Sequence, residues 1–138
     1  MKKIDHIGVA VRDLDKALSL YRDVLGMAIG GTDEVPAQKV RLAFVPVGDT
    51  RLELLEPTQA DSNIAKFLES RGEGVHHIAL EVEDIEGALA RLKEKGVRLI
   101  NPEPVKGAHN TRIAFLHPKE TNGVLLELVE QPADPPHG

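Results

Sequence analysis

The chain repeats one of its own segments, and this repeat limits what it can fold into. Residues 5–27 read DHIGVAVRDLDKALSLYRDVLGM, and residues 74–97 read GVHHIALEVEDIEGALARLKEKGV. A shift of 71 residues aligns identical side chains in the two segments: His6 with His77, Ile7 with Ile78, Val11 with Val82, Asp13 with Asp84, Ala17 with Ala88, and Leu18 with Leu89. A period this long indicates duplication of a whole supersecondary unit. We therefore expect two related halves.

Each copy of the segment has the pattern of a strand followed by a helix. Apolar residues alternate with other residues over 4–11 and over 77–82, which is typical of a strand with one buried face. An aspartate in N-cap position follows each strand, at Asp13 and Asp84. An apolar stripe at helical spacing comes next, and Gly26 and Gly96 stand where the helices should end.

The repeat continues into two predicted hairpins, of strands 40–47 with 51–56 and of strands 112–116 with 124–130. RLELLEP in the first hairpin matches LLELVEQP in the second if the second turn is three residues longer, and this match pairs Glu53 with Glu127. Residues 97–100 are predicted to form a further strand and residues 64–70 a short helix. The glycine- and proline-containing segments 30–38 and 101–110 are predicted to be loops, so the early hairpin strand of the first half is poorly marked.

Length and composition fit one domain of 138 residues with modules at about 4–70 and 75–130, and a disordered tail at 132–138. The chain has no cysteine, which excludes disulfides, thiolate metal ligands and cysteine nucleophiles. The net charge is -5 and the basic residues are interspersed with acidic ones, so nucleic-acid binding is not expected. The first residues contain no long apolar run, which predicts neither signal peptide nor membrane span and favours a cytoplasmic protein.

Four polar side chains stand at matching places in the two halves: His6, Glu53, His77 and Glu127. The apolar residues of each first strand should face the following helix, so the histidines should face the other side of the sheet. The glutamates lie between leucines that point the opposite way and can share this inner face. A lone histidine or glutamate in a strand is usually an ordinary polar residue, but four at equivalent positions of a repeat favour a common site.

Two imidazoles and two carboxylates form a donor set of intermediate hardness. Such a set suits Co²⁺, Mn²⁺, Ni²⁺, Fe²⁺ or Zn²⁺ better than Mg²⁺ or Ca²⁺, which prefer oxygen ligands only. Four protein ligands leave up to two octahedral positions for water or substrate, as a catalytic metal requires. His76 is expected beside the site or at the surface, and His109, His117 and His137 have no counterpart in the first half.

The segments DHIGVAV, ELLEP, HHIALEV and GVLLELVE resemble the vicinal oxygen chelate superfamily, which includes glyoxalase I, extradiol dioxygenases and antibiotic-resistance proteins. The resemblance covers residues 4–130. It implies an α+β fold of two paired βαβββ modules that form a curved sheet around a metal site. It also implies that His6, Glu53, His77 and Glu127 bind the metal and that Glu127 acts in catalysis.

Further segments are similar to the methylmalonyl-CoA epimerases of this superfamily: GDTRLELLEP, DSNIAKFLESRGEGVHHIALEV, KGAHN and FLHPKETNGVLLEL. Asn110 replaces the last glycine of the usual GAHG loop. This similarity implies proton transfer at C2 of methylmalonyl-CoA through a metal-stabilised enolate. It further implies a divalent metal, with Co²⁺ expected first and Mn²⁺, Ni²⁺ or Zn²⁺ as alternatives, an acyl-CoA substrate, and a homodimer.

The proton-transfer group opposite Glu127 stays open at this point. Some family members have a glutamate on the early hairpin strand, but the corresponding residue here is Leu42. Glu53, a metal-bound water or His109 could take that role. Lys106, Arg112 and Lys119 could contact coenzyme A phosphates or be ordinary solvated charges.

Two other functions share parts of this pattern. A lactoylglutathione lyase, or another enzyme of the superfamily, would have the same ligand set and different substrate loops. A metal-free binding protein of the resistance type would bind a ligand without chemistry, although such proteins typically lack the four candidate ligands that this chain keeps.

Overall fold

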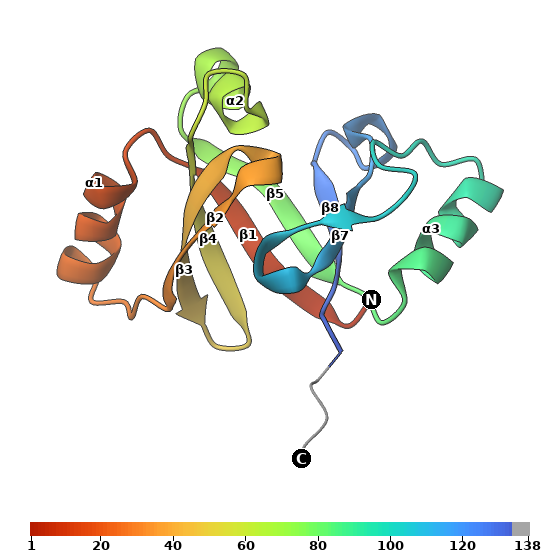
Figure 1. Ribbon diagram of the computed structural model, residues 1–138, viewed down its shortest axis with the longest axis horizontal. Coiled ribbons are helices and arrows are strands. Elements are labelled where there is room, and N and C mark those ends of the chain that lie inside the picture. The colour runs from red at the N-terminus through yellow and green to blue at the C-terminus, as the bar shows by residue number, and fades with distance from the viewer. Residues whose placement is uncertain (134–138) are drawn as a thin grey trace.

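The computed structural model describes residues 1–133 and contains one curved sheet with helices packed against it (Figure 1). The strands lie in the order β2-β3-β4-β1-β5-β8-β7-β6. Their bounds are β1 Lys3–Ala10, β2 Gly31–Val35, β3 Val40–Val47, β4 Thr50–Pro57, β5 Gly74–Glu81, β6 Val105–Lys106, β7 Arg112–Phe115 and β8 Leu126–Glu130. The helices are α1 Leu14–Leu18, α2 Asn63–Arg71 and α3 Ile85–Glu94. None of the described helices has the length and apolarity to span a membrane.

The predicted pair of βαβββ modules is confirmed, and the two modules join within one chain. β1 and β5 pair antiparallel at the centre of the sheet, and each also pairs in parallel with the last strand of its own half. Gly8 lies opposite Glu53, and Ala79 lies opposite Glu127. Because Gly8 and Ala79 are themselves equivalent in the repeat, the two halves have the same register.

The predicted strand parity is also confirmed. Val11 and Leu54 pack with α1 in one core cluster, and Val82 and Leu128 pack with α3 in another. Figure 1 shows α1 and α3 on opposite sides of the molecule, each on the outer side of its own half of the sheet. The inner side is therefore left to the side chains of opposite parity, among them the four predicted site residues.

The helices begin where the capping residues predict. Asp13 accepts a hydrogen bond from the Lys16 amide, and Asp84 accepts one from the Gly87 amide. A second acid caps each helix from the last strand of its half. Glu56 accepts from the Leu14 amide at 2.7 Å, and Glu130 from the Ile85 amide at 2.9 Å. The duplication thus includes the attachment of each helix to its sheet.

Predictions were wrong for two regions, one in each half. Residues 31–35 form the edge strand β2 rather than a loop, because backbone pairing with β3 on one side stabilises even the polar sequence GTDEV. In the second half the early strand is β6 inside the predicted loop 101–110, whereas 97–100 contributes only a bridge from Leu99 to Leu116. The first helix extends as far as predicted: it continues from Leu18 as a π-helical segment, Ser19–Val24, and Gly26 follows with a positive φ of 71°. Most of the tail predicted to be disordered, residues 134–138, lies outside the described part of the chain.

Candidate active site

All four predicted site residues lie on the inner side of the sheet, and each is at most 6 % exposed. They border a cavity of about 390 Å³. Its polar lining includes His6, Arg51, Glu53, His76, His77 and Glu127, and its apolar lining includes Leu42, Leu55, Ile64, Ile113, Phe115 and Val129. Buried acids and imidazoles in a largely apolar cavity are the features expected of a ligand site.

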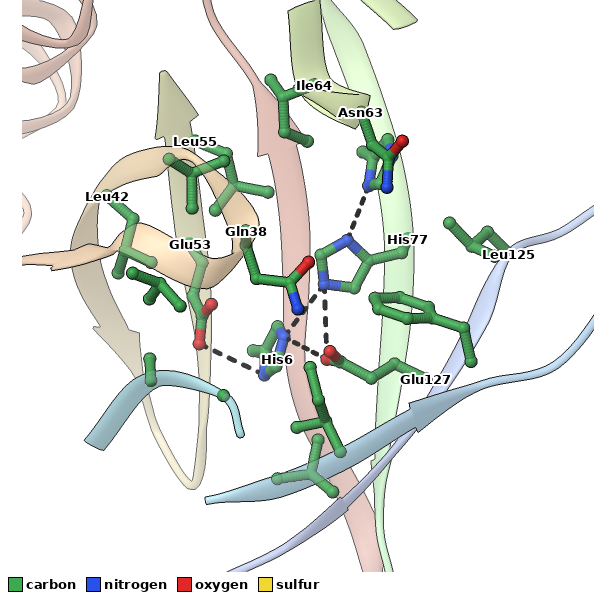
Figure 2. Close-up of a pocket in the computed structure, with 18 of the residues that line it drawn as sticks. His6, Gln38, Leu42, Glu53, Leu55, Asn63, Ile64, His77, Leu125 and Glu127 are labelled. Atoms are coloured by element: carbon green, nitrogen blue, oxygen red, sulfur yellow. Dashed lines mark hydrogen bonds and ion pairs between the residues drawn. The ribbon is translucent and has the colours of Figure 1, made fainter. Parts of the chain in front are cut away.

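His6, His77 and Glu127 converge on one point. His6 Nε2 lies 3.1 Å from His77 Nε2 and 2.9 Å from Glu127 Oε1. His77 Nε2 lies 3.5 Å from the same carboxylate oxygen. Figure 2 shows the three side chains pointing toward one another from β1, β5 and β8. Three donor atoms this close together could hold one metal ion.

Glu127 Oε1 is the atom of this group that lacks an adequate partner. It is buried and accepts no well-directed hydrogen bond from any described residue, although both imidazoles are near. A buried carboxylate oxygen without a directed donor is costly unless a cation meets it. The donor set therefore fits a divalent metal of the type that binds imidazole and carboxylate together.

Glu53 approaches His6 from the other side (Figure 2). Its Oε2 lies 3.2 Å from His6 Nδ1 and also contacts the guanidinium of Arg51, 3.0 Å from Nη2. In this arrangement Glu53 belongs to a second donor group with Asp5 and His6, separate from the group of His77 and Glu127. The sequence thus predicted the four residues correctly as neighbours, but their division into two groups around His6 is a feature of the structure alone.

The electrostatics of the site favour ionised carboxylates. Burial by itself would raise the pKa of Glu127, but the adjacent imidazoles of His6 and His77 outweigh it and lower this pKa to about 2. Burial likewise opposes the charged form of His6, yet its contacts with Asp5, Glu127 and Glu53 raise its pKa to about 10. Among the described residues, no carboxylate forms a salt bridge with His76. Burial, followed by the charge of His77, lowers the pKa of His76 to about 4, although the charge of Glu127 opposes this shift.

The raised pKa of His6 predicts that the metal-free protein loses stability in alkali. A group whose pKa is higher in the folded state contributes stability that is complete below its unfolded value of 6.5 and is lost as the pH rises toward about 10. From pH 7 to 9.5 we expect the free energy of unfolding of chelator-treated protein to fall by a few kcal/mol, since one pKa unit corresponds to about 1.4 kcal/mol.

Urea unfolding at several pH values measures this loss. The His6→Gln variant is the matched control, because it lacks the titrating group and should lose much less stability over the same range. Equal slopes for the two proteins would contradict the assigned role of His6.

Several residues near the site were missed or only partly recognised from the sequence. Asp5 is 1 % exposed and lies 2.7 Å from His6 Nδ1, although simple strand alternation would place it on the other face. Arg51 bridges Asp5 and Glu53. His76, expected beside the site or at the surface, lies 2.9 Å from His77 Nδ1. One feature of the sequence could have identified Asp5: the repeat aligns it with His76.

The remaining sequence candidates lie elsewhere. His109 stacks on Phe44 and lies near Asp33 of β2, and it is not among the residues that line the main cavity. Arg112 pairs with Glu86 and Glu130, which favours a structural role over contact with coenzyme A. Asn110 adopts a left-handed conformation with a φ of 60°, as its replacement of a loop glycine suggested.

Comparison with known proteins identifies the family of this chain. Residues 5–115 match the Glyoxalase/Bleomycin resistance protein/Dioxygenase superfamily. An ethylmalonyl-CoA/methylmalonyl-CoA epimerase of Cereibacter sphaeroides is 44% identical over 91% of this chain and 96% of its own length. The mitochondrial methylmalonyl-CoA epimerase of Mus musculus is 43% identical over 91% of this chain and 71% of its own length.

A solved structure extends this similarity to three dimensions. A variant of the Streptomyces coelicolor methylmalonyl-CoA epimerase, in complex with 2-nitronate-propionyl-CoA, matches with a TM-score of 0.90 and 42% identity over 96% of this chain and 99% of the other. The curved sheet, its register and these matches agree with the resemblance found in the sequence. The chain belongs to the glyoxalase/bleomycin resistance/dioxygenase superfamily, and close relatives of it within that superfamily are methylmalonyl-CoA epimerases.

Proposed function

We propose that this protein is a metal-dependent epimerase that interconverts (R)- and (S)-methylmalonyl-CoA by moving the proton at C2. The observation that carries the proposal is a pair of buried glutamates at equivalent positions of the repeat, on opposite sides of His6 in one cavity (Figure 2). Epimerisation needs one group on each side of the reacting carbon, to remove the proton and to return it. The named activities of the relatives support this assignment.

Glu127 and Glu53 are the proton-transfer groups in this proposal. Glu127 is ionised at neutral pH because the neighbouring imidazoles lower its pKa, and its Oε1 borders the cavity without a directed hydrogen-bond donor among the described residues. Glu53 takes the opposite side because Leu42, at the position where some family members have a glutamate, contributes only an apolar side chain to the cavity. The apolar wall that Leu42 forms with Leu55 and Ile64 keeps water from the reacting carbon.

The metal would be held by His6, Glu53, His77 and Glu127, and Co²⁺ is our first choice among the divalent ions. When bound, it supplies a Lewis acid for the negative charge that develops on the substrate oxygens as the proton leaves. Of this set, Glu53 lies on the Nδ1 side of His6, where Arg51 also contacts it. We further propose that the protein is a cytoplasmic homodimer and that its reaction lies between propionyl-CoA and succinyl-CoA. All four residues of the site come from one chain, so a partner subunit is not required to complete it.

The test is deuterium uptake at C2 of methylmalonyl-CoA in D₂O. Metal-loaded protein should incorporate deuterium and convert one epimer into the other. Chelator treatment should lower this rate at least about a hundredfold, and Co²⁺ should restore it. Absence of exchange in the metal-loaded protein would refute the proposal. Turnover of the methylglyoxal–glutathione hemithioacetal instead would indicate a lactoylglutathione lyase, and chelator-insensitive ligand binding without turnover would indicate a resistance-type protein.

A further inference from the structure

The two central strands carry matching irregularities beside the two histidines. In the β1–β5 ladder the pairing passes from Ile4 to His6 and skips Asp5. Farther along the same ladder it passes from His77 to Val75 and skips His76. Each strand therefore has a β-bulge whose extra residue directly precedes a histidine of the site, and such bulges commonly re-aim side chains near active sites.

The bulge in β1 turns the Asp5 carboxylate toward the ring of His6. Asp5 Oδ2 lies 2.7 Å from His6 Nδ1 and accepts a hydrogen bond from Arg51 Nη2 at 3.2 Å. Asp5 Oδ1 accepts a hydrogen bond from Gln131 Nε2 at 2.7 Å. Both carboxylate oxygens are thus occupied by groups from three different parts of the chain, which fixes Asp5 in one orientation.

The bulge in β5 serves His77 with a different chemistry. His76 Nδ1 lies 2.9 Å from His77 Nδ1, and the ring of His76 packs edge-on against Phe67 of α2. His76 is an imidazole, so His77 has a partner that brings no negative charge. The two halves therefore share the geometry of the bulge and differ in the charge that each histidine receives.

We propose that Asp5 is a positioning residue for His6. By holding Nδ1, it keeps the ring turned so that Nε2 faces His77 and Glu127, and its negative charge strengthens metal binding at Nε2. A carboxylate on the second nitrogen of a ligating histidine fixes the ring and makes the ligand more basic, and its loss typically costs 10- to 100-fold in metal affinity. The inference rests on the proposed function, because it takes the group of His6, His77 and Glu127 as the metal site.

Asp5 itself is a poor candidate for a metal ligand. Asp5, His6 and Glu53 also converge closely enough to hold an ion. Arg51 already supplies a cation to this group, since Nη2 lies 3.2 Å from Asp5 and 3.0 Å from Glu53. Within the described part of the chain, no guanidinium contacts the group of His77 and Glu127, and this group contains the carboxylate oxygen without a directed donor. The metal therefore belongs on the Nε2 side of His6.

The test is equilibrium titration of chelator-treated protein with Co²⁺, followed by the visible absorption of the bound ion. The Asp5→Asn variant keeps the size of the side chain and removes its charge, and we expect its dissociation constant for Co²⁺ to rise about 10- to 100-fold with an altered spectrum. Asp49→Asn, in the turn before β4, is the matched control and should bind like the wild type. A dissociation constant for Asp5→Asn within twofold of the wild type would overturn the inference.

A second variant tests the inference without replacing a buried residue. Gln131 is exposed and donates to Asp5 Oδ1. Gln131→Leu should leave the unfolding free energy of the metal-free protein nearly unchanged and weaken Co²⁺ binding about threefold, because Asp5 is held less firmly. Unchanged Co²⁺ affinity in Gln131→Leu would contradict the positioning role. A loss of Co²⁺ affinity in Asp5→Asn that is fully explained by unfolding of the variant would contradict it as well. If the wild type bound no Co²⁺ at all, the proposed metal-dependent function would fail together with this inference.

Discussion

Replacing Glu127 by glutamine or alanine is expected to abolish epimerisation. Glu127 contacts both histidines at the point where the three donor atoms converge, so its loss removes a metal ligand and a proton-transfer group together. Loss of a general acid or base alone usually slows a reaction by 10²- to 10⁴-fold. We therefore expect the rate for Glu127→Gln to fall by at least about 10³-fold, measured as conversion of one pure epimer into the other.

The control for this result is a glutamate of the same charge outside the cavity. Glu103 is exposed and pairs only with Lys93 in the described part of the chain, so Glu103→Gln should keep the wild-type rate. Circular dichroism of Glu127→Gln should show the native fold, because the glutamine fills the same space. A near-normal rate in a folded Glu127→Gln protein would show that Glu127 is neither a ligand nor a base.

The sequence predicted the central architecture because the repeat and strand parity are properties of the whole chain. Aligning His6 with His77 also aligned the strands around them, and the observed pairs Gly8–Glu53 and Ala79–Glu127 follow from the same match. Alternation then assigned all four polar residues to the inner face. No single residue needed to be interpreted correctly for this prediction to succeed.

The details that the sequence did not reveal arise where local structure departs from a regular period. Asp5 and His76 occupy β-bulges, and one extra residue in a strand cancels the alternation on which the assignment of faces depends. The polar strand β2 is stabilised by its pairing with β3, and its own side chains carry little strand signal. Tertiary pairing decides such elements, so a pattern read along the chain does not find them.

The structure also sharpens which group can stand opposite Glu127. Leu42 lies in the cavity wall and is 2 % exposed, so β3 contributes no carboxylate at that position. His109 contacts Phe44 of β3 and Asp33 of β2, and it does not line the cavity. The sequence left three candidates for this role: Glu53, His109 and a metal-bound water. Of the two side chains, Glu53 is the one that borders the cavity and can exchange a proton.

Replacing Glu53 by glutamine is expected to separate proton exchange from epimerisation. Glu127 and both histidines remain, so three donors can still hold the metal, and the glutamine oxygen can serve as a weaker fourth. Glu127 can then remove the C2 proton of one epimer and return a deuteron to the same face, while no group returns it to the other face. Epimerisation should fall by 10²- to 10⁴-fold, whereas deuterium uptake should continue into one epimer only.

Mass spectrometry of each pure epimer after incubation in D₂O measures the two processes separately. Glu69→Gln, on the exposed side of α2, is the matched control and should leave both processes at wild-type rates. Equal loss of exchange in both epimers would assign Glu53 to metal binding alone. Uptake into both epimers with normal conversion would exclude Glu53 from proton transfer. A water molecule would then remain of the candidates predicted from the sequence, because His109 does not line the cavity. The prediction thus discriminates between the two roles that the position of Glu53, beside His6 and Arg51, allows.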